Sequence, residues 1–321
     1  MIYAAYVVVA SLVVWFSILA SRYIDMIDRT TRLSGAFLGG VLLSAVTSLP
    51  ELFTSISATV FLDQPDLCIG NILGSDLFNL GMLGVVVLFS IRLFSRAACS
   101  RSHIIVVGYL ILMYAALGLR WAGVISLRIG WFDLTTLIIF ALYGLAVRHL
   151  AAENGEQPSA DEQAEECSLT VGQIAARFTL ASIGIIALSI ALTYITDNIS
   201  ERLDLGAGLA GALFLGVATS LPEVTSTIAL FRMRNYNIAV GNIIGSNVFN
   251  FFVLGIADFV SSGQGVYSFT DSKVQLLLIF GSIATPLAAA MIISRRPVIR
   301  LACAAGMVAC YILFLSFPSF S

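Results

Sequence analysis

Two short motifs occur twice in this chain, in the same order. The pentapeptide TSLPE stands at 47–51 and again at 219–223. Each copy is followed by the pattern GN-x-x-GS-x-x-x-N, first over 70–79 and then over 241–250. The two copies are offset by 172 positions for the first motif and by 171 for the second, so one residue is missing between the motifs in the later copy. We expect the chain to fold as two similar halves that bring these motifs face to face.

The composition is that of a membrane protein with many spans. Of the 321 residues, 59% are hydrophobic and 11% are charged, and the mean hydropathy is +0.96, values that a soluble globular domain does not reach. The net charge of −2 gives no reason to expect a nucleic-acid partner. Apolar runs long enough to cross a bilayer cover about 2–20, 33–61, 67–90, 103–119, 131–149, 173–196, 206–231, 236–260, 272–293 and 298–317.

These runs predict an all-α polytopic membrane protein with ten transmembrane helices. The repeated motifs fall in the second and third run of each set of five, and because five is odd, the second half must enter the membrane upside down relative to the first. We therefore expect two inverted five-helix repeats with discontinuous core helices. The predicted organisation is a first repeat over 1–150 with core motifs at 44–79, an acidic linker over 151–171, and a second repeat over 172–321 with core motifs at 216–250.

The basic residues predict the orientation in the membrane. If the N-terminus is outside, the outer segments hold only Arg120, Arg128, Arg202 and Lys273, and the other members of the 17 lysines and arginines lie on the cytoplasmic side. This bias follows the positive-inside rule. We expect a multi-pass protein of the cell membrane with both termini extracytoplasmic and with the linker 151–171 in the cytoplasm.

Two glutamates lie inside long apolar segments, and each directly follows a proline. An acid at the bilayer centre costs about 2.5–3.5 kcal/mol even on insertion scales, so Glu51 and Glu223 are candidates for a functional site. Pro50 and Pro222 have no amide hydrogen, so each removes one helical hydrogen bond and opens a turn beside the acid. Unwound backbone at membrane depth is tolerated where it lines a polar cavity. Carboxylates, hydroxyls and freed carbonyls together suit hard cations such as Ca²⁺ and Na⁺.

The spacing of the polar residues predicts four polar helix faces that converge on this site. Residues four apart lie on one face of a helix. Small residues beside these faces allow two backbones to approach closely, and glycines stand there at 70, 74, 241 and 245. The polar sets are Thr47, Glu51 and Ser55; Thr219, Glu223 and Thr227; Asn71, Ser75 and Asn79; and Asn242, Ser246 and Asn250.

The two motif blocks resemble the α-repeats of the cation/Ca²⁺ exchanger superfamily, nearest its sodium/calcium exchanger branches of prokaryotic type. The resemblance implies a secondary antiporter that exchanges Ca²⁺ for Na⁺ by alternating access. It implies that Glu51 and Glu223 bind calcium with carbonyl help from Thr47 and Thr219. The residues that it implies for the sodium sites are Ser48, Ser220, Ser75, Ser246, Asn79 and Asn250.

The chain departs from this pattern at two positions. The position of Asn250 is often an aspartate in the sodium/calcium branches, and the position of Asp76 is usually an asparagine. Asp76 is thus a further candidate, either as a third carboxylate of the site or as a group that hydrogen-bonds the amides around it. Potassium coupling is not expected, because the related exchangers tie it to the aspartate that Asn250 replaces. Asp258, farther along the same helix, is expected outside the site, in an outer vestibule or as a helix cap.

Other functions remain as alternatives. A Ca²⁺/H⁺ antiporter of the same fold, or one for another divalent cation, would use Glu51 and Glu223 as proton carriers. A passive cation channel fits less well with an inverted repeat and closely packed helices. An enzyme is not expected, because no His or Cys accompanies the two glutamates. The bound groups we expect are the transported Ca²⁺ and Na⁺ and no other cofactor, in a protein that sits in a lipid bilayer and works as a monomer.

Overall fold

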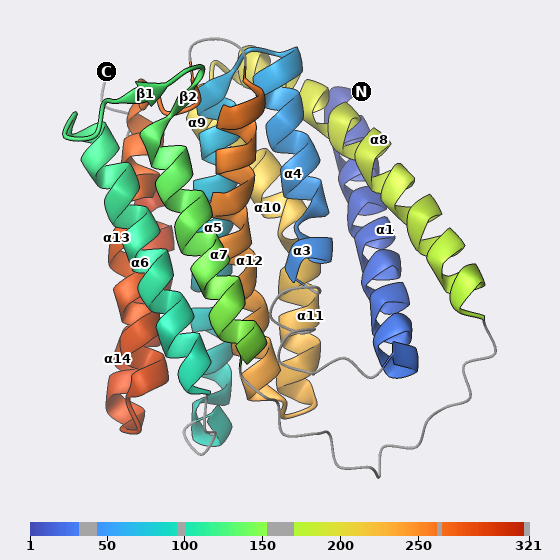
Figure 1. Cartoon of the computed structure of the whole chain (residues 1–321), viewed down its shortest axis with the longest axis vertical. Coiled ribbons are helices and arrows are strands. Elements are labelled where there is room, and N and C mark those ends of the chain that lie inside the picture. The colour runs from blue at the N-terminus through green and yellow to red at the C-terminus, as the bar shows by residue number, and fades with distance from the viewer. Residues whose placement is uncertain (32–43, 95–99, 153–169, 262–264, 318–321) are drawn as a thin grey trace.

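The structure, a computed structural model, describes residues 1–31, 44–94, 100–152, 170–261 and 265–317. These residues form a bundle of long helices and one small β-hairpin (Figure 1). The predicted all-α polytopic class is confirmed, and the hairpin is an addition that the hydropathy pattern does not contain. The residues 153–169, most of the predicted acidic linker, lie outside the described part of the chain.

The helices follow the predicted apolar runs. The first half contains α1 (Ile2–Thr31), α3 (Ser44–Thr47), α4 (Leu49–Ile56), the π-helix η2 (Ser57–Phe61), α5 (Pro65–Phe94), α6 (Arg101–Trp121), the strands β1 (Arg128–Ile129) and β2 (Phe132–Asp133), and α7 (Leu134–Ala152). The second half contains α8 (Val171–Leu203), α9 (Ala207–Ala210), the π-helix η3 (Gly211–Gly216), α10 (Val217–Thr219), α11 (Leu221–Arg232), α12 (Tyr236–Val260), α13 (Ser272–Ile293) and α14 (Pro297–Ser316).

By length and hydropathy, seven of the described helices can each cross a membrane, and a bent pair, Ala207–Thr219 with Leu221–Arg232, makes an eighth. The apolar helices at Leu49–Phe61 and Leu134–Leu150 are shorter. Part of the predicted span 33–61 lies outside the described residues. The predicted number of ten spans is therefore not established by these residues and stays a prediction.

The two core helices are discontinuous, as the prolines predict. The first is interrupted at Ser48, between α3 and α4, and the second at Ser220, between α10 and α11, where the axis bends by 45°. In Figure 1, α4 continues upward from α3 whereas α11 continues downward from α10. The two broken helices thus run in opposite directions through the bundle, with both interruptions at its middle.

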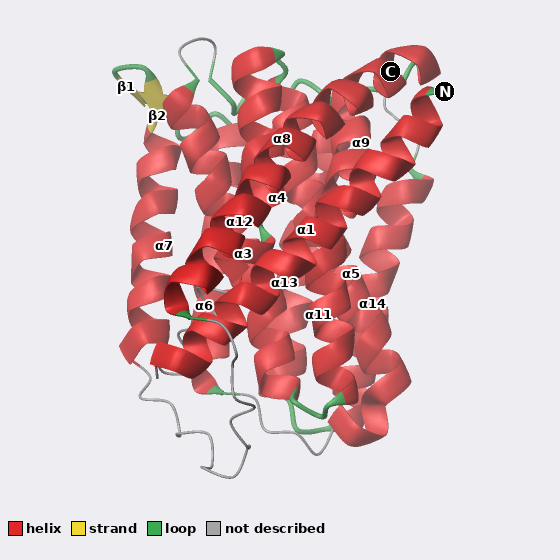
Figure 2. Cartoon of the chain, turned by 90° about the vertical axis from the view of Figure 1, so that its right-hand side faces the viewer, coloured by secondary structure: helices red, strands yellow, loops and turns green. Residues whose placement is uncertain are grey.

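The helices α1 and α8 pack on each other as a long pair at one side of the bundle (Figure 1). Figure 2 shows both slanting across the face that α3, α4 and α11 present. Side-chain hydrogen bonds join the pair to the core at three places: Tyr6 donates to the carbonyl of Phe214 at 2.7 Å, Gln64 Nε2 donates to Asp197 Oδ1 at 2.5 Å, and Thr193 Oγ1 lies 3.5 Å from the carbonyl oxygen of Thr54. Helices that are joined to a core mainly through apolar contacts can change their position at low cost.

The helix α5 lies directly against the backbone of the second broken helix. A Cβ atom built on Gly70 would stand 2.3 Å from the carbonyl oxygen of Gly208, and one built on Gly74 would stand 2.4 Å from the Cα atom of Ala212. Only glycine permits this distance between two helices. The predicted close approach is confirmed at these two positions, and it holds the second motif of the first repeat beside the broken helix of the second repeat.

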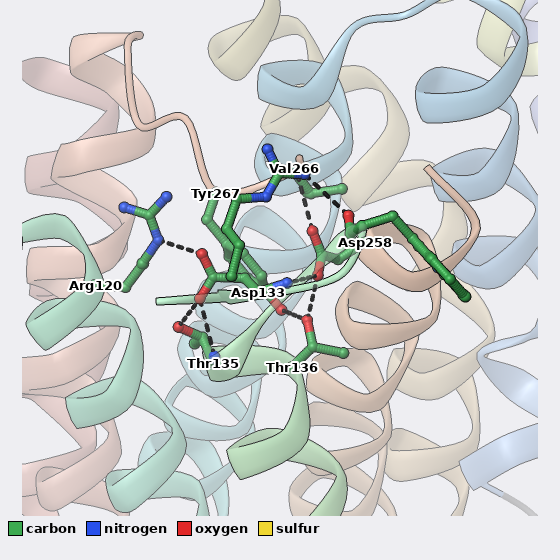
Figure 3. A network of polar contacts seen from close by, with 9 residues as sticks. Arg120, Asp133, Thr135, Thr136, Asp258, Val266 and Tyr267 are labelled. Carbon is green, nitrogen blue, oxygen red and sulfur yellow. Dashed lines mark hydrogen bonds and ion pairs between the residues drawn. The ribbon is translucent and has the colours of Figure 1, made fainter. Parts of the chain in front are cut away.

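Asp258 corrects one expectation. It does not face a vestibule: its side chain is fully buried, and it accepts hydrogen bonds from the backbone of Asp133 at 2.9 Å, from the Thr136 hydroxyl at 2.5 Å and from the backbone of Val266 at 3.3 Å (Figure 3). Burial, with the nearby charge of Asp258, raises the pKa of Tyr267 well above its ordinary value, and the hydroxyl of Tyr267 lies 2.9 Å from that of Thr136. The acid therefore joins α12 to the β-hairpin, to the first turn of α7 and to the segment before α13, because its donors belong to Asp133, Thr136 and Val266.

Candidate ion-binding site

The two glutamates lie at equivalent places, in the first turn of the second half of each broken helix. Glu51 is in the first turn of α4 and Glu223 is in the first turn of α11. Both side chains are fully buried. The N-terminus of a helix carries partial positive charge, which stabilises a carboxylate in its first turn. The interruption at each proline thus creates a helix N-terminus beside each glutamate, and this N-terminus stabilises the negative charge of the carboxylate.

Each glutamate is held by the other repeat. The hydroxyl of Ser48 donates to Oε1 of Glu223 at 3.0 Å, and the hydroxyl of Ser220 donates to Oε1 of Glu51 at 3.2 Å. Each serine stands at the interruption of one broken helix and donates to the glutamate of the other broken helix, so the two hydrogen bonds are reciprocal. The second carboxylate oxygen of each glutamate is buried and has no hydrogen-bond partner. Two acceptor oxygens from opposite halves therefore remain available at the middle of the bundle.

Two asparagines hold the turns that carry the glutamates. The Nδ2 atom of Asn71 donates to Thr54 Oγ1 and to Ser55 Oγ, both at 2.9 Å, and lies 3.4 Å from the carbonyl oxygen of Glu51. In the other repeat, Asn242 Nδ2 donates to Thr227 and to the carbonyl of Glu223, both at 3.3 Å. This role did not follow from the motif, although the motif repeats both asparagines. Both of their Oδ1 atoms are buried without a partner.

A second reciprocal pair lies farther along α5 and α12. Asn79 Nδ2 donates to Asn247 Oδ1 at 3.0 Å, and Asn250 Nδ2 donates to Asp76 Oδ1 at 2.9 Å. The Oδ1 atoms of Asn79 and Asn250 are buried and unpartnered. Of the two roles open to Asp76, this geometry matches that of a group that hydrogen-bonds the amides.

The other predicted site residues are also buried at the interruptions or on the facing helices. The Thr47 hydroxyl donates to the carbonyl of Ser44 at 3.2 Å, and the Thr219 hydroxyl donates to the carbonyl of Leu215 at 2.9 Å. On the facing helices, Ser75 donates to the carbonyl of Gly216 at 3.2 Å. Ser246 is fully buried, and its hydroxyl oxygen has no partner. All the predicted residues of the two repeats are fully or almost fully buried.

The arrangement is suited to binding cations through oxygen. Leaving a buried acceptor without a donor costs about 1–3 kcal/mol, so a cluster of such acceptors is stable only if something else satisfies them. Within the described residues no group of three His, Cys, Asp or Glu side chains could hold a metal ion, so a cation at this place would be bound by the two carboxylates together with neutral oxygens. Hard cations take oxygen ligands of this kind. Within the four predicted polar faces, the buried oxygens without a partner belong to Glu51, Glu223, Asn71, Asn242, Asn79, Asn250 and Ser246.

Comparisons with known proteins agree with this architecture. A family model described as "Sodium/calcium exchanger protein" matches residues 2–150 and 174–320. The inner membrane protein YrbG of Escherichia coli is 28% identical over 75% of this chain and 74% of its own length. The putative antiporter CaxA of Alkalimonas amylolytica is 26% identical over 81% of this chain and 84% of its own length. A solved structure of the sodium-calcium exchanger NCX_Mj, soaked with Na⁺ and Sr²⁺, has the same fold, with a TM-score of 0.66 and 20% identity over 99% of this chain and 100% of that chain.

Proposed function

The chain belongs to the sodium/calcium exchanger protein family, and from this premise we propose that it is a secondary antiporter that exchanges Ca²⁺ for Na⁺ by alternating access. The observation that carries the proposal is the reciprocal pair of serine–glutamate hydrogen bonds, Ser48 with Glu223 and Ser220 with Glu51. It leaves one free carboxylate oxygen from each repeat at the centre of the bundle. A single ion bound between the two carboxylates would contact both halves at once.

In this proposal Glu51 and Glu223 bind Ca²⁺, and the carbonyls of Thr47 and Thr219 assist them. Calcium requires oxygens at about 2.3–2.6 Å and takes six to eight of them. Sodium ions divide the same oxygens and use in addition the side chains of Ser48, Ser220, Ser75, Ser246, Asn79 and Asn250. Because the ions share ligands, Ca²⁺ and Na⁺ compete, and competition for one site is the basis of exchange.

Charge explains why exchange is favoured over leak. Two glutamates give the site a charge of −2, which one Ca²⁺ or two Na⁺ neutralise. The empty, doubly charged site is expensive to desolvate, so the protein with no ion bound changes its access slowly. The state change itself is assigned to α1 and α8. This pair lies beside the core and packs against α3 through an apolar cluster that includes Ala20, Val46 and Ile185.

The test is radioactive Ca²⁺ uptake by purified protein in proteoliposomes that are loaded with Na⁺ and diluted into Na⁺-free buffer. Uptake that needs the outward Na⁺ gradient is the expected result. Glu51→Gln and Glu223→Gln each remove one of the two charges and should abolish that uptake. Glu201→Gln, the same chemical change at an exposed residue of α8, is the matched control and should leave it intact.

Two outcomes would overturn the proposal. Calcium uptake that ignores the Na⁺ gradient and follows a pH jump would assign the protein to proton coupling, with the two glutamates as the proton carriers. Undiminished Na⁺-driven uptake by Glu51→Gln would remove the glutamate pair from the mechanism.

A further inference from the structure

Asp76 of α5 joins three helices beside the proposed ion site. It is fully buried. Its Oδ1 atom accepts from Asn250 of α12 at 2.9 Å, and its Oδ2 atom lies 3.4 Å from the hydroxyl of Tyr114 of α6. Its backbone carbonyl accepts from Nδ2 of Asn247 at 3.0 Å. Both carboxylate oxygens therefore face protein donors and not the two glutamates.

These contacts determine which way the amides point. An asparagine side chain has a donor end and an acceptor end of almost the same shape, whereas a carboxylate and a backbone carbonyl offer acceptors only. The nitrogen of Asn250 must then face Asp76, and the nitrogen of Asn247 must face the Asp76 carbonyl. The oxygen of Asn247 in turn receives the nitrogen of Asn79 at 3.0 Å. The result is that Asn79 and Asn250 both direct an unpartnered oxygen away from this cluster.

The geometry points to Asp76 as a positioning residue for sodium, a group that never touches the ion but holds the oxygen of Asn250 toward it. The inference rests on the proposed function, because it takes Asn79 and Asn250 as sodium ligands. An amide that turned its nitrogen to the cavity would offer a donor where a cation needs an acceptor. The equivalent residue of the other repeat, Asn247, is itself an amide, and its nitrogen faces the backbone carbonyl of Asp76, which any residue at this position offers. The side chain of Asp76 therefore acts on Asn250 alone.

The carboxylate is itself held in place. Tyr114 lies with its ring edge-on to Phe251, at a centroid distance of 4.8 Å. On the other side it fills the space that a side chain at Gly281 would need, because a Cβ atom there would stand 2.5 Å from the tyrosine oxygen. The phenol is thus confined between α12 and α13, and its hydroxyl is directed at Asp76.

The experiment measures Na⁺-driven Ca²⁺ uptake by the full-length protein in proteoliposomes, as a function of Na⁺ and of Ca²⁺ separately. Asp76→Asn gives Asn250 a neighbour that can accept or donate, so its direction is no longer determined. The Na⁺ concentration for half-maximal uptake should rise about five- to tenfold, the effect of about one hydrogen bond, while the KM for Ca²⁺ changes less than about twofold. Asp258→Asn is the matched control: the same change at another buried aspartate should lower thermal stability and leave the Na⁺ dependence unchanged.

A double variant, Asp76→Asn with Asn250→Asp, exchanges the acid and the amide. The pair again has one acceptor-only member, and an oxygen at position 250 faces the site in either rotamer. We expect the Na⁺ dependence to return to within about threefold of the wild type. If the single variant does not assemble, the double variant alone decides: a Na⁺ dependence like that of the wild type supports the inference, and its loss contradicts it.

The outcomes separate this inference from the proposed function. A wild-type protein without Na⁺-driven uptake would overturn the proposed function, whatever the variants do. An active wild type with an unchanged Na⁺ dependence in Asp76→Asn would overturn only the positioning role. A uniform loss of maximal rate and of melting temperature, with no shift in Na⁺ dependence and no rescue by the double variant, would show that Asp76 serves folding alone.

Discussion

The same substitution at the first glycine of each repeated GN motif should have unequal effects. Gly70 and Gly241 are equivalent in sequence, yet they face different surroundings. A Cβ atom on Gly70 would meet the backbone of Gly208, with 2.3 Å to its carbonyl oxygen. A Cβ atom on Gly241 would meet the ring of His103, with 2.7 Å to its Cε1 atom. Backbone in a packed helix cannot move aside alone, whereas an imidazole ring can rotate.

The magnitude for Gly70→Ala follows from this distance. Ordinary van der Waals contact begins near 3.4 Å, so α5 and α9 would have to separate by about 1 Å. Overpacking of this kind costs about 1–3 kcal/mol. Replacing a helical glycine by alanine returns up to about 1 kcal/mol through helix propensity. We therefore expect Gly70→Ala to destabilise the protein by about 1–2 kcal/mol net, and Gly241→Ala to be near neutral.

The measurement is the midpoint of thermal unfolding in detergent, followed by size-exclusion chromatography of each variant fused to a fluorescent protein. The control is Gly108→Ala in α6, where no atom lies within 4 Å of the added methyl group. The expected order of stability is Gly108→Ala, wild type and Gly241→Ala close together, and Gly70→Ala clearly below. Transport by Gly70→Ala should also fall, because the next residue, Asn71, holds the turn of Glu51. Equal shifts for Gly70→Ala and Gly241→Ala would refute the reasoning.

Three further predictions concern hydrogen bonds and one close contact. Ser48→Ala and Ser220→Ala each remove one hydrogen bond to a buried carboxylate, a loss of about 1.5–3 kcal/mol. Both variants should reduce Na⁺-driven Ca²⁺ uptake to a similar extent, and uptake rates that differ between them by more than about tenfold would contradict the reciprocal geometry. Gly281→Ala should displace Tyr114 and raise the Na⁺ concentration for half-maximal uptake. An unchanged Na⁺ concentration would show that the hydroxyl of Tyr114 is not needed to hold the carboxylate of Asp76. Asp258→Ala leaves several buried donors unpaired and should lower the unfolding midpoint without altering ion dependence, which uptake at varied Na⁺ checks.

Much of the candidate site could be predicted from local chemistry. Proline within an apolar run predicts an interruption, and the structure has one at Ser48 and one at Ser220. A charged residue beside such an interruption predicts a functional group, and both glutamates are buried where the two broken helices meet. These inferences need only the covalent properties of proline and the cost of burying an acid, which are the same in any fold.

The contacts between helices could not be predicted in the same way. Periodicity tells which residues share a face of one helix, but the partner across the gap depends on crossing angles and on the depth at which each helix packs. The burial of Asp258 is an example, because its donors come from Asp133 of β2, from Thr136 of α7 and from Val266, which lies between α12 and α13. The hydrogen bonds from Asn71 and Asn242 to the turns that carry the glutamates are a second example. Polar residues spaced four apart share a helix face, but this spacing does not show which of them faces an ion and which faces a neighbouring turn.

The two repeats place equivalent atoms at equivalent positions of the site. The positions at which the two sequences differ therefore determine how the two halves of the site differ. The bonds from Asn79 to Asn247 and from Asn250 to Asp76 are equivalent in position, at 3.0 Å and 2.9 Å. One acceptor is a neutral amide and the other is an acid. Because equivalent positions have similar geometry, this difference comes from the sequence and not from the fold, and it places an acid beside Asn250 and an amide beside Asn79. An exchanger built from two copies of one unit can therefore acquire unequal ion sites through a single residue, without changing a helix.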